Sequence, residues 1–378
     1  SFSIIIIIIV SIIIGTITAT GGTGADMDDP RPVLSVIWVA PFVHACGYGT
    51  EALATLRAIA AAAAMLDGRV EHELVVGALH GGLPLEVEHL ARLDNDEAVF
   101  LMAALQQAEV IRRSHRPRSS RLVIVCHLPP PLWATCSELA DETRADALVG
   151  RTMFETDSVP EAWLATLRSA DTLWLPTPHA AAIFADALDN HVPVEALGQT
   201  VDMTLFAASP DSLPELDSVF LYVGRWTSRK NVAGLIAAYL AAFTERDRVR
   251  LVLHTQVPGG SLDHAIAAIV ADSPALAGRD QATFPLIEAS TAVLSSQGMA
   301  ELLRSASVVV LPSHGEGWGR PLMEAMAVGR PVVGVAFAGP PAFVTPDAGW
   351  LLDPHPLVSF ASTIGADHYP GHRWARVS

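Results

Sequence analysis

The chain has very little positive charge, and lysine is nearly absent from it. Lys230 is the only lysine among 378 residues, and the formal net charge at pH 7 is −16. An acidic surface repels the phosphate backbone of nucleic acids, so this composition argues against a nucleic-acid-binding protein. Any phosphate-binding site must therefore be a local cluster of arginine, Lys230 and backbone N–H groups.

Cysteine and clear metal-binding patterns are scarce as well. The three cysteines stand at spacings that fit no zinc site, and we expect them to be buried apolar thiols. They are Cys46, Cys126 and Cys136. The string Asp94-Asn95-Asp96 has the form in which some transferases hold Mg²⁺ or Mn²⁺, but it follows a helical, charged stretch and not a strand end, so we interpret it as a solvated turn. We predict neither a metal site nor a cofactor.

Basic residues are also missing around the most apolar segment. Residues 2–17 are nearly all isoleucine and valine, which is slightly short of the roughly 20 residues of a membrane span. We assign residues 1–25 as a hydrophobic leader, either a membrane anchor or signal segment or a low-complexity leader. The chain also lacks an Asn-x-Ser/Thr acceptor that would support a luminal address. The location stays open between the cytoplasm and association with a membrane through the leader.

Beyond residue 32, short apolar runs alternate with helical patterns. Strands separated by helices pair in parallel through right-handed crossovers, which predicts doubly wound α/β sheets. The predicted strands are residues 33–39, 72–78, 122–126, 172–175, 219–223, 249–254, 308–311 and 331–335. The predicted helices are residues 50–66, 98–113, 162–169, 179–188, 232–243, 300–305 and 321–328.

The alternating pattern restarts after a polar, proline-bearing stretch at residues 209–214. Such stretches typically join domains. We therefore predict two Rossmann-like α/β domains, over residues 30–208 and 215–378. Two such domains facing each other across a cleft would bind a ligand at the carboxyl ends of their strands.

The strongest chemical signal is a glycine-rich loop between a predicted strand and helix, over residues 311–327. Such a loop offers unpaired N–H groups and the positive end of a helix dipole, which suit an anion. Glu316 lies in the loop, and Glu324 lies about one turn into the helix. Two carboxylates beside a phosphate site fit a ligand whose phosphate joins hydroxylated rings, because carboxylates accept hydrogen bonds from hydroxyl groups.

This segment resembles the Glu-x7-Glu motif of retaining GT-B glycosyltransferases, the glycosyl transferases group 1 (GT4-like) family. The resemblance implies that Glu316 contacts the transferred sugar and that Glu324 contacts the ribose of the nucleotide. The loop residues assigned to donor binding are Gly317, Trp318 and Gly319. Trp318 and Arg320 stand where Phe and Leu are commoner, which changes the shape expected for the sugar pocket.

A second cluster lies where the predicted strand 219–223 ends. Gly224 and Arg225 close the strand, and Lys230 follows one short loop later. We assign Gly224 to donor binding. Arginine and lysine so placed can converge on a diphosphate. The pattern resembles the family's Gly-Arg…Lys-Gly segment, which implies that Arg225 and Lys230 hold the donor phosphates, with Asn231 in place of the usual glycine. We interpret Arg229 as a surface charge.

The amino-terminal half carries weaker signals. Gly47 and Gly49 precede a helix and resemble the family's glycine-rich loop beside the acceptor and the donor phosphate, although a plain tight turn explains them nearly as well. His127, directly after a strand, has either a catalytic or sugar-contacting role or that of an ordinary loop histidine. For Glu155, a capping or salt-bridge role is favoured over that of an acid facing the cleft.

Together these patterns and the resemblance predict a retaining hexosyltransferase that needs no metal. It would move a sugar from a nucleotide-diphosphate sugar to a glycan, lipid or protein acceptor. Two alternatives stay open: a nucleotide-sugar epimerase on the same fold, and a degenerate or truncated homologue that binds the donor without turnover. The second is motivated by the short stretch after Glu324, where a helix crossing back to the amino-terminal domain is not evident. A glycan phosphorylase is disfavoured because Lys230 is the only lysine available for pyridoxal phosphate.

Overall fold

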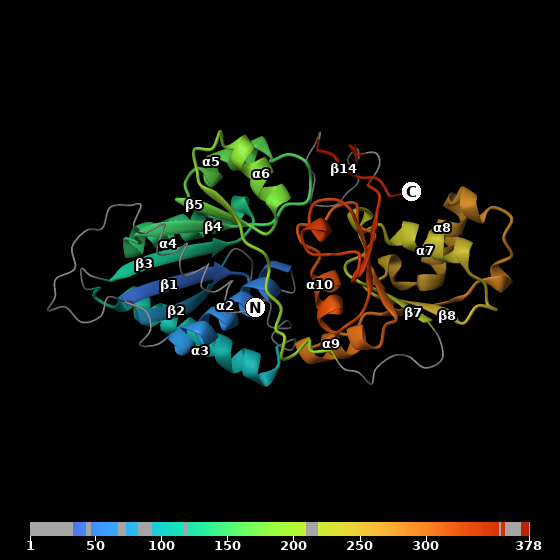
Figure 1. Cartoon of the computed structure of the whole chain (residues 1–378), viewed down its shortest axis with the longest axis horizontal. Coiled ribbons are helices and arrows are strands. Elements are labelled where there is room, and N and C mark those ends of the chain that lie inside the picture. The colour runs from blue at the N-terminus through green and yellow to red at the C-terminus, as the bar shows by residue number, and fades with distance from the viewer. Residues whose placement is uncertain are drawn as a thin grey trace. The chain divides into compact units, whose positions relative to one another are not determined.

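The computed structural model describes residues 33–42, 47–66, 73–81, 93–116, 120–208, 218–354, 357–359 and 372–377. The predicted leader and the predicted interdomain stretch lie outside these residues. Among the helices described, none is long and apolar enough to cross a membrane. The chain forms two compact units, each built on its own six-stranded sheet (Figure 1).

The first unit takes the described residues up to Met153, together with Val159–Asp202. Its strands pair in parallel in the order β2-β1-β3-β4-β5-β6. They are β1 (Val33–Ala40), β2 (Glu73–His80), β3 (Arg121–His127), β4 (Ala147–Arg151), β5 (Thr172–Leu175) and β6 (Val194–Ala196). The helices are α2 (Gly47–Leu66), α3 (Asn95–Arg113), α4 (Ala134–Thr143), α5 (Leu164–Leu167) and α6 (Pro178–Ala187).

The central strands of the first unit are almost wholly buried. Helices on a parallel sheet cover both of its faces, so β1 and β3 are continuous apolar runs and do not alternate. The core gathers around two tryptophans, Trp38 on β1 and Trp174 on β5, whose ring centroids lie 6.4 Å apart. The predicted alternation of strands and helices is thus confirmed here, except that α4, β4 and β6 were not predicted.

Residues 94–96 begin helix α3 and do not form an isolated turn. The Asp94 side chain accepts a hydrogen bond from the Glu97 N–H at 2.8 Å, and the Glu97 carboxylate accepts one from the Asp94 N–H at 3.1 Å. This reciprocal pair satisfies backbone donors that the first helical turn would leave unpaired. The Asp-x-Asp form is therefore explained by capping.

The expectation of buried apolar thiols is wrong for two of the three cysteines. Cys126, near the end of β3, forms a disulfide with Cys136 in α4, and both residues are fully buried. Helix α4 packs back beside β3 and brings the two Cα atoms to 5.8 Å, a separation that suits a disulfide. The sequence pattern did not reveal the pair because α4 itself was not predicted. Cys46 lies outside the described residues.

The second unit takes Phe154–Ser158 and the described residues from Met203 onward. Its parallel sheet has the order β12-β11-β10-β7-β8-β9. The strands are β7 (Ser218–Val223), β8 (Val249–His254), β9 (Leu286–Ser290), β10 (Val308–Val310), β11 (Val332–Val335) and β12 (Gly349–Leu352), with a separate antiparallel pair of β13 (Leu357–Val358) and β14 (Trp374–Ala375). The helices are α7 (Val232–Ala242), α8 (Leu262–Asp272), α9 (Ser296–Arg304) and α10 (Arg320–Ala327).

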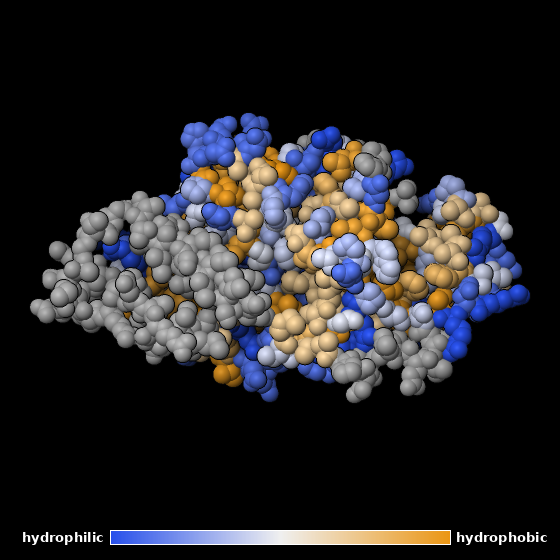
Figure 2. All heavy atoms as spheres, viewed as in Figure 1, coloured by the Kyte–Doolittle hydropathy of each residue, from blue (hydrophilic) through white to orange (hydrophobic). Residues whose placement is uncertain are grey.

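The surface of the second unit is mixed in character. On the face shown in Figure 2, polar and apolar residues alternate over its described part. Single exposed apolar side chains such as Trp350 on β12 are common on folded proteins and do not by themselves mark an interface.

Candidate donor site and a buried charge cluster

The two sequence motifs of the carboxyl-terminal half meet at the carboxyl ends of two neighbouring strands in the second sheet. Strands β7 and β10 are neighbours in parallel, so the segments that follow them leave the sheet on the same side. Lys230 Nζ donates a hydrogen bond to Glu316 Oε1 at 2.5 Å, across 86 residues of sequence. The structure thus brings together the predicted phosphate-binding lysine and the predicted sugar-contacting carboxylate.

Arg229 belongs to the same cluster, and its interpretation as a surface charge is wrong. Its side chain is buried, and its Nη1 donates to the Gly315 carbonyl oxygen at 2.7 Å. The same nitrogen lies 3.7 Å from Glu316 Oε2, while Nη2 lies 3.4 Å from Glu155 Oε1. The salt-bridge role favoured for Glu155 is therefore confirmed, with Arg229 as its partner.

A tight turn at Asn231 explains why two consecutive basic residues lie at this edge. Residues Ser228–Lys230 form one 3-10 turn, which ends at Asn231 with a φ of 53°. Among residues other than glycine, asparagine tolerates this left-handed conformation best, because its short polar side chain clashes least. Asn231 thus takes the place of the family's glycine without loss of the turn.

The electrostatics of the pair are set by burial and by the neighbouring charges. Burial raises the pKa of Glu316, but Lys230 and Arg229 together lower it by more than burial raises it. The pKa of Glu316 therefore lies below its ordinary value. Burial also lowers the pKa of Lys230, and Glu316 offsets only part of this effect. Glu316 is therefore a carboxylate at neutral pH, with two cations around it.

Glu324 is paired as well. Arg320, the first residue of α10, donates to Glu324 Oε1 through Nε at 3.1 Å and through Nη2 at 2.8 Å. Burial raises the pKa of Glu324, and Arg320 opposes this effect. The residue that departs from the family's common Leu thus contacts the carboxylate predicted to bind the ribose.

The remaining loop residues mainly support the loop. Trp318 stacks on Phe343 with ring centroids 4.7 Å apart, and its indole N–H donates to the Met323 sulfur at 3.1 Å. Gly319 has a φ of 99°, which favours glycine, and it caps the start of α10. Gly317 lies between Glu316 and Trp318, and its role in donor binding stays a prediction.

Strand β7 ends in a rigid corner. The Tyr222 hydroxyl donates to the Arg225 carbonyl oxygen at 2.9 Å, and a Cβ at Gly224 would lie 2.7 Å from that hydroxyl. A larger residue at Gly224 would therefore have to displace the Tyr222 hydroxyl. The Arg225 side chain is exposed at the end of β7, and its binding of the donor phosphates stays a prediction.

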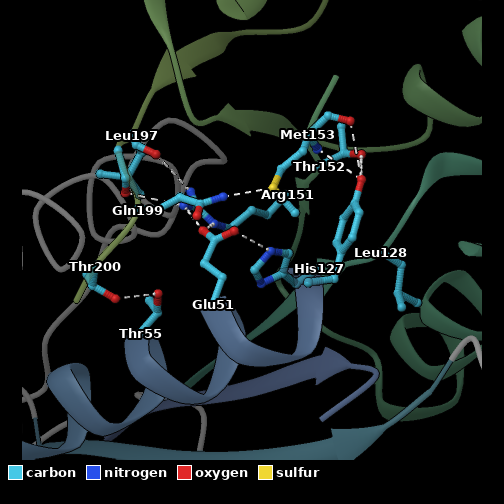
Figure 3. Close-up of polar contacts among 12 residues, drawn as sticks. Glu51, Thr55, His127, Leu128, Arg151, Thr152, Met153, Leu197, Gln199 and Thr200 are labelled. Carbon is cyan, nitrogen blue, oxygen red and sulfur yellow. Dashed lines mark hydrogen bonds and ion pairs between the residues drawn. The ribbon is translucent and has the colours of Figure 1, made fainter. Parts of the chain in front are cut away.

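A second charge cluster lies in the first unit and was not predicted as a set (Figure 3). Glu51, on the first turns of α2, accepts hydrogen bonds on Oε1 from the Arg151 guanidinium, through Nε at 2.8 Å and through Nη2. His127 Nε2 lies 3.2 Å from Glu51 Oε2. Arg151 and His127 lower the pKa of Glu51 to about 2, against burial, which raises it. Sequence signals did exist, because Glu51 stands in an alanine-rich helix and Arg151 ends an apolar strand.

The hydrogen bonds of His127 define its tautomer. An indole N–H can only donate, and Trp38 Nε1 donates to His127 Nδ1 at 3.2 Å. Nδ1 is therefore unprotonated, and the ring proton lies on Nε2, facing Glu51 Oε2. Fully buried and bonded through both nitrogens, His127 is not an ordinary loop histidine.

Gly47 and Gly49 do not precede the helix as predicted but form the first turn of α2, which is held beside this cluster. Between the two glycines, the Tyr48 hydroxyl accepts a hydrogen bond from the Met153 N–H at 3.0 Å and lies 2.9 Å from Thr152 Oγ1. The start of α2 is thus tied to the segment that follows β4. Ligand binding by the glycines stays a prediction.

Comparison with known proteins agrees with the motifs. Residues 217–366 match the family described as Glycosyl transferases group 1. The match covers less than half of the chain and lies in its carboxyl-terminal part. The resemblance that the Glu-x7-Glu segment predicted is therefore confirmed at the level of the family.

The curated relatives of this group 1 domain include two with stated activities. A D-inositol 3-phosphate glycosyltransferase of Salinispora tropica is 29% identical over 222 residues, which is 52% of this chain and 43% of the relative. An O-antigen chain mannosyltransferase B of Escherichia coli is 29% identical over 153 residues, 38% of this chain and 35% of the relative. The chain thus matches less than half the length of these relatives.

Solved structures resemble the whole described chain. HepE of Anabaena in complex with UDP-glucose has a TM-score of 0.55 at 14% identity, covering 85% of this chain and 86% of that one. Sucrose-phosphate synthase of Thermosynechococcus elongatus also has a TM-score of 0.55, at 17% identity, covering 86% and 87%. These likenesses confirm the predicted GT-B fold of two Rossmann-like domains.

The part of the chain that the structure describes offers no cluster of metal ligands. Within that part of the chain, no group of three or more His, Cys, Asp or Glu side chains could hold a metal ion. Metal independence and the lack of a cofactor stay predictions.

Proposed function

We propose that this group 1 protein is a retaining glycosyltransferase that moves a sugar from a nucleotide-diphosphate sugar to an acceptor. The observation that carries the proposal is the contact of Lys230 with Glu316 at the carboxyl ends of β7 and β10. It joins a cation suited to phosphate with a carboxylate suited to sugar hydroxyls, as the family motifs require. Solved relatives of the same fold bind UDP and UDP-glucose, which supports a nucleotide-sugar donor.

In the proposed reaction the cations stabilise the leaving group. The bond from the anomeric carbon to the donor phosphate breaks, which builds negative charge on the diphosphate oxygens. Arg225 and Lys230 lie where they can stabilise that charge, and so does the positive end of helix α10. Glu316 positions the transferred sugar and Glu324 the ribose.

Retention requires the acceptor to attack from the face that the diphosphate leaves. The acceptor oxygen forms the new bond to the anomeric carbon, and its proton passes to a departing phosphate oxygen. No enzyme base takes part in this scheme. The state of His127 is consistent with it, because its proton faces Glu51 and its other nitrogen accepts from Trp38.

For the sugar and the acceptor, we propose a chemical class and no single compound. The relatives named above transfer sugars to inositol phosphate or within an O-antigen chain, which favours a hexose donor and a glycan, lipid or other hydroxylated acceptor. Association with a membrane would depend on residues 1–25, outside the described residues.

The first test is donor binding by calorimetry on the full chain. UDP, GDP, UDP-glucose and GDP-mannose would be titrated into the wild type, into Arg225→Ala and into Glu316→Ala. We expect micromolar binding of one donor, weakened about 10- to 100-fold by Arg225→Ala, because charged hydrogen bonds contribute about 1.5–3 kcal/mol. Arg246→Ala is the control, because the side chain of Arg246 is 90% exposed. A well-folded wild type that binds none of these donors would overturn the proposal and favour a degenerate homologue.

Product analysis then separates transfer from the epimerase alternative. A transferase releases the nucleoside diphosphate together with a new glycoside or, without acceptor, with free sugar. An epimerase returns an isomeric nucleotide sugar and releases no nucleoside diphosphate. Isomerisation without release would replace the proposed activity with the alternative.

A further inference from the structure

Arg229 makes more contacts with the Glu316 loop than any role in phosphate binding needs. Its guanidinium donates to the Gly315 carbonyl oxygen at 2.7 Å, and its own carbonyl oxygen accepts from the His314 N–H at 2.8 Å. Its Nη1 also lies 3.7 Å from Glu316 Oε2. Side chain and backbone of one residue thus hold three consecutive residues of the loop.

The side chain of Arg229 has few places to move. It is 9% exposed, whereas a solvated arginine would lie mostly in water. Glu155 Oε1 lies 3.4 Å from Nη2 and supplies a second negative charge, so the buried guanidinium is shared by two carboxylates. A buried guanidinium with two carboxylates and a carbonyl around it is held in one place.

The segment that carries Glu155 packs directly on the same loop. A Cβ at Gly315 would lie 2.4 Å from the Glu155 carbonyl oxygen, so only glycine fits there. Asp157, two residues on, accepts hydrogen bonds from the Arg373 backbone N–H at 2.8 Å and from Arg373 Nε at 2.6 Å. The Ala375 N–H in turn donates to the His314 carbonyl oxygen at 2.8 Å. Phe154–Ser158 and residues 372–377 therefore enclose the loop together with Arg229.

Lys230 differs from Arg229 in what it can do when a donor arrives. Lys230 contacts Glu316 through a single ammonium group, a point charge on a flexible stem that can turn to a phosphate. Arg229 is fixed by the loop carbonyl and by Glu155. If Lys230 moves to the diphosphate, Arg229 is the cation in these contacts that stays beside Glu316.

We propose that Arg229, neutralised by Glu155, is a positioning residue that holds Glu316 for the donor sugar while Lys230 moves to the donor diphosphate. This inference rests on the proposed function for the identity of the ligand. It predicts that the two residues contribute to affinity for different parts of the donor. Lys230 binds the nucleoside diphosphate, and Arg229 affects binding of the sugar only by holding Glu316.

The test compares binding of UDP-glucose with binding of UDP, or the GDP pair if the wild type prefers it. The variants are Arg229→Gln, Glu316→Gln and the double variant, with Arg246→Gln as the exposed control. We expect Arg229→Gln to weaken binding of the nucleotide sugar about tenfold while affinity for UDP changes little, because one charge-assisted contact is lost at the sugar only. Glu316→Gln should give the same pattern, and the double variant should add little to either single change.

A conservative variant of Arg229 separates a specific loss of sugar binding from a loss caused by misfolding. Arg229→Lys keeps a charge near Glu316 but cannot reach Gly315, Glu316 and Glu155 together, so it should recover part of the preference for the nucleotide sugar. Equal weakening of UDP and UDP-glucose by Arg229→Gln would overturn the inference, since a phosphate-binding or general structural role predicts that result. Full additivity of the two single changes would overturn it as well.

A measurement without ligand keeps this inference apart from the proposed function. The same variants, melted in the absence of donor, should show non-additive changes in Tm, because the two side chains are in one network. If the wild type binds no donor, the proposed function fails, and the role at the sugar fails with it. Additive Tm changes would show that Arg229 does not hold Glu316, whatever the ligand.

Discussion

The two units each bury a cluster of opposite charges, and the two clusters differ in balance and exposure. In the first unit Glu51 faces one guanidinium, and the side chains of Arg151 and Glu51 are 2% and 0% exposed. In the second unit Glu316 faces both Lys230 and Arg229, and the side chains of Lys230 and Glu316 are 14% and 10% exposed. Because Arg229 also pairs with Glu155 and stays beside Glu316, this partly exposed cluster can release Lys230 to an anionic ligand. A sealed one-to-one pair cannot.

The first cluster is also closed by its other hydrogen bonds. Arg151 donates to the Leu197 carbonyl oxygen at 3.1 Å and to that of Gly198 at 3.3 Å, which ties β4 to the segment after β6. The second carboxylate oxygen of Glu51 faces the ring proton of His127. Such a fully bonded network fixes the start of α2. Similar residue types thus hold the fold in one unit and are available for binding in the other.

The cluster of Glu51, Arg151 and His127 in the first unit is here called the sealed cluster. Breaking it should have the largest effect on stability. Glu51→Gln leaves the Arg151 guanidinium buried without a counter-charge, and removing one partner of a buried pair costs about 3–5 kcal/mol. We expect urea unfolding of the first unit to show a loss of this size. Glu316→Gln should cost clearly less, because its surroundings are more exposed and still hold Glu155. Equal losses for the two variants would contradict the distinction between the clusters.

Low pH should act on the same cluster with a smaller effect. The folded-state pKa of Glu51 is lowered to about 2 from an ordinary value of 4.5, so its contribution is complete above pH 4.5 and is lost as pH falls toward 2. The shift corresponds to about 3 kcal/mol, at about 1.4 kcal/mol for each pKa unit. The measurement is the difference in unfolding free energy between wild type and Glu51→Gln at several pH values. It should shrink between pH 4.5 and 2, and a constant difference would show that Glu51 is not the titrating group.

The cluster of Glu316, Lys230 and Arg229 in the second unit is here called the open cluster. Breaking it should affect donor binding more than folding. Lys230→Met removes the ammonium group proposed to hold the donor diphosphate, and we expect donor affinity to fall about 10- to 100-fold, or about 1.5–3 kcal/mol. Burial lowers the pKa of Lys230 and so already disfavours its charge in the folded state, which makes a large loss of stability unexpected. Calorimetry and thermal melting on one preparation compare the two effects. A large drop in Tm with unchanged affinity would reverse the roles assigned to the clusters.

Much of the fold could be predicted because its strands are buried and apolar. Strand β5 lies where the sequence pattern placed it, since a covered parallel strand is a mostly apolar run. Strand β9 was not predicted because it is short and largely exposed, so it offers little apolar pattern to detect. Helix α8 was not predicted either, although its sequence is largely apolar.

The open cluster was predicted in part and the sealed one hardly at all. Lys230 and Glu316 stand in local motifs whose spacing carries their chemistry, so the sequence indicated both. Arg229 gave no such signal, because its burial depends on contacts with Glu155 and Gly315 far along the chain. Glu51 and Arg151 lie 100 residues apart and meet only through the sheet order of the first unit.

The smallest expected effect concerns the turn that borders the sealed cluster. Tyr48→Phe removes the hydroxyl that accepts from the Met153 N–H at 3.0 Å, and loss of one such hydrogen bond costs about 0.5–1.5 kcal/mol. Tyr239→Phe is the matched control, because it removes a hydroxyl that donates to the Leu286 carbonyl oxygen at 3.1 Å in the second unit. Hydrogen exchange should show faster opening of the Met153 amide only in Tyr48→Phe. If the Met153 amide exchanges equally in both variants, Tyr48 does not fasten the Gly47–Gly49 turn to β4, and the sealed cluster must hold the start of α2 through Glu51 alone.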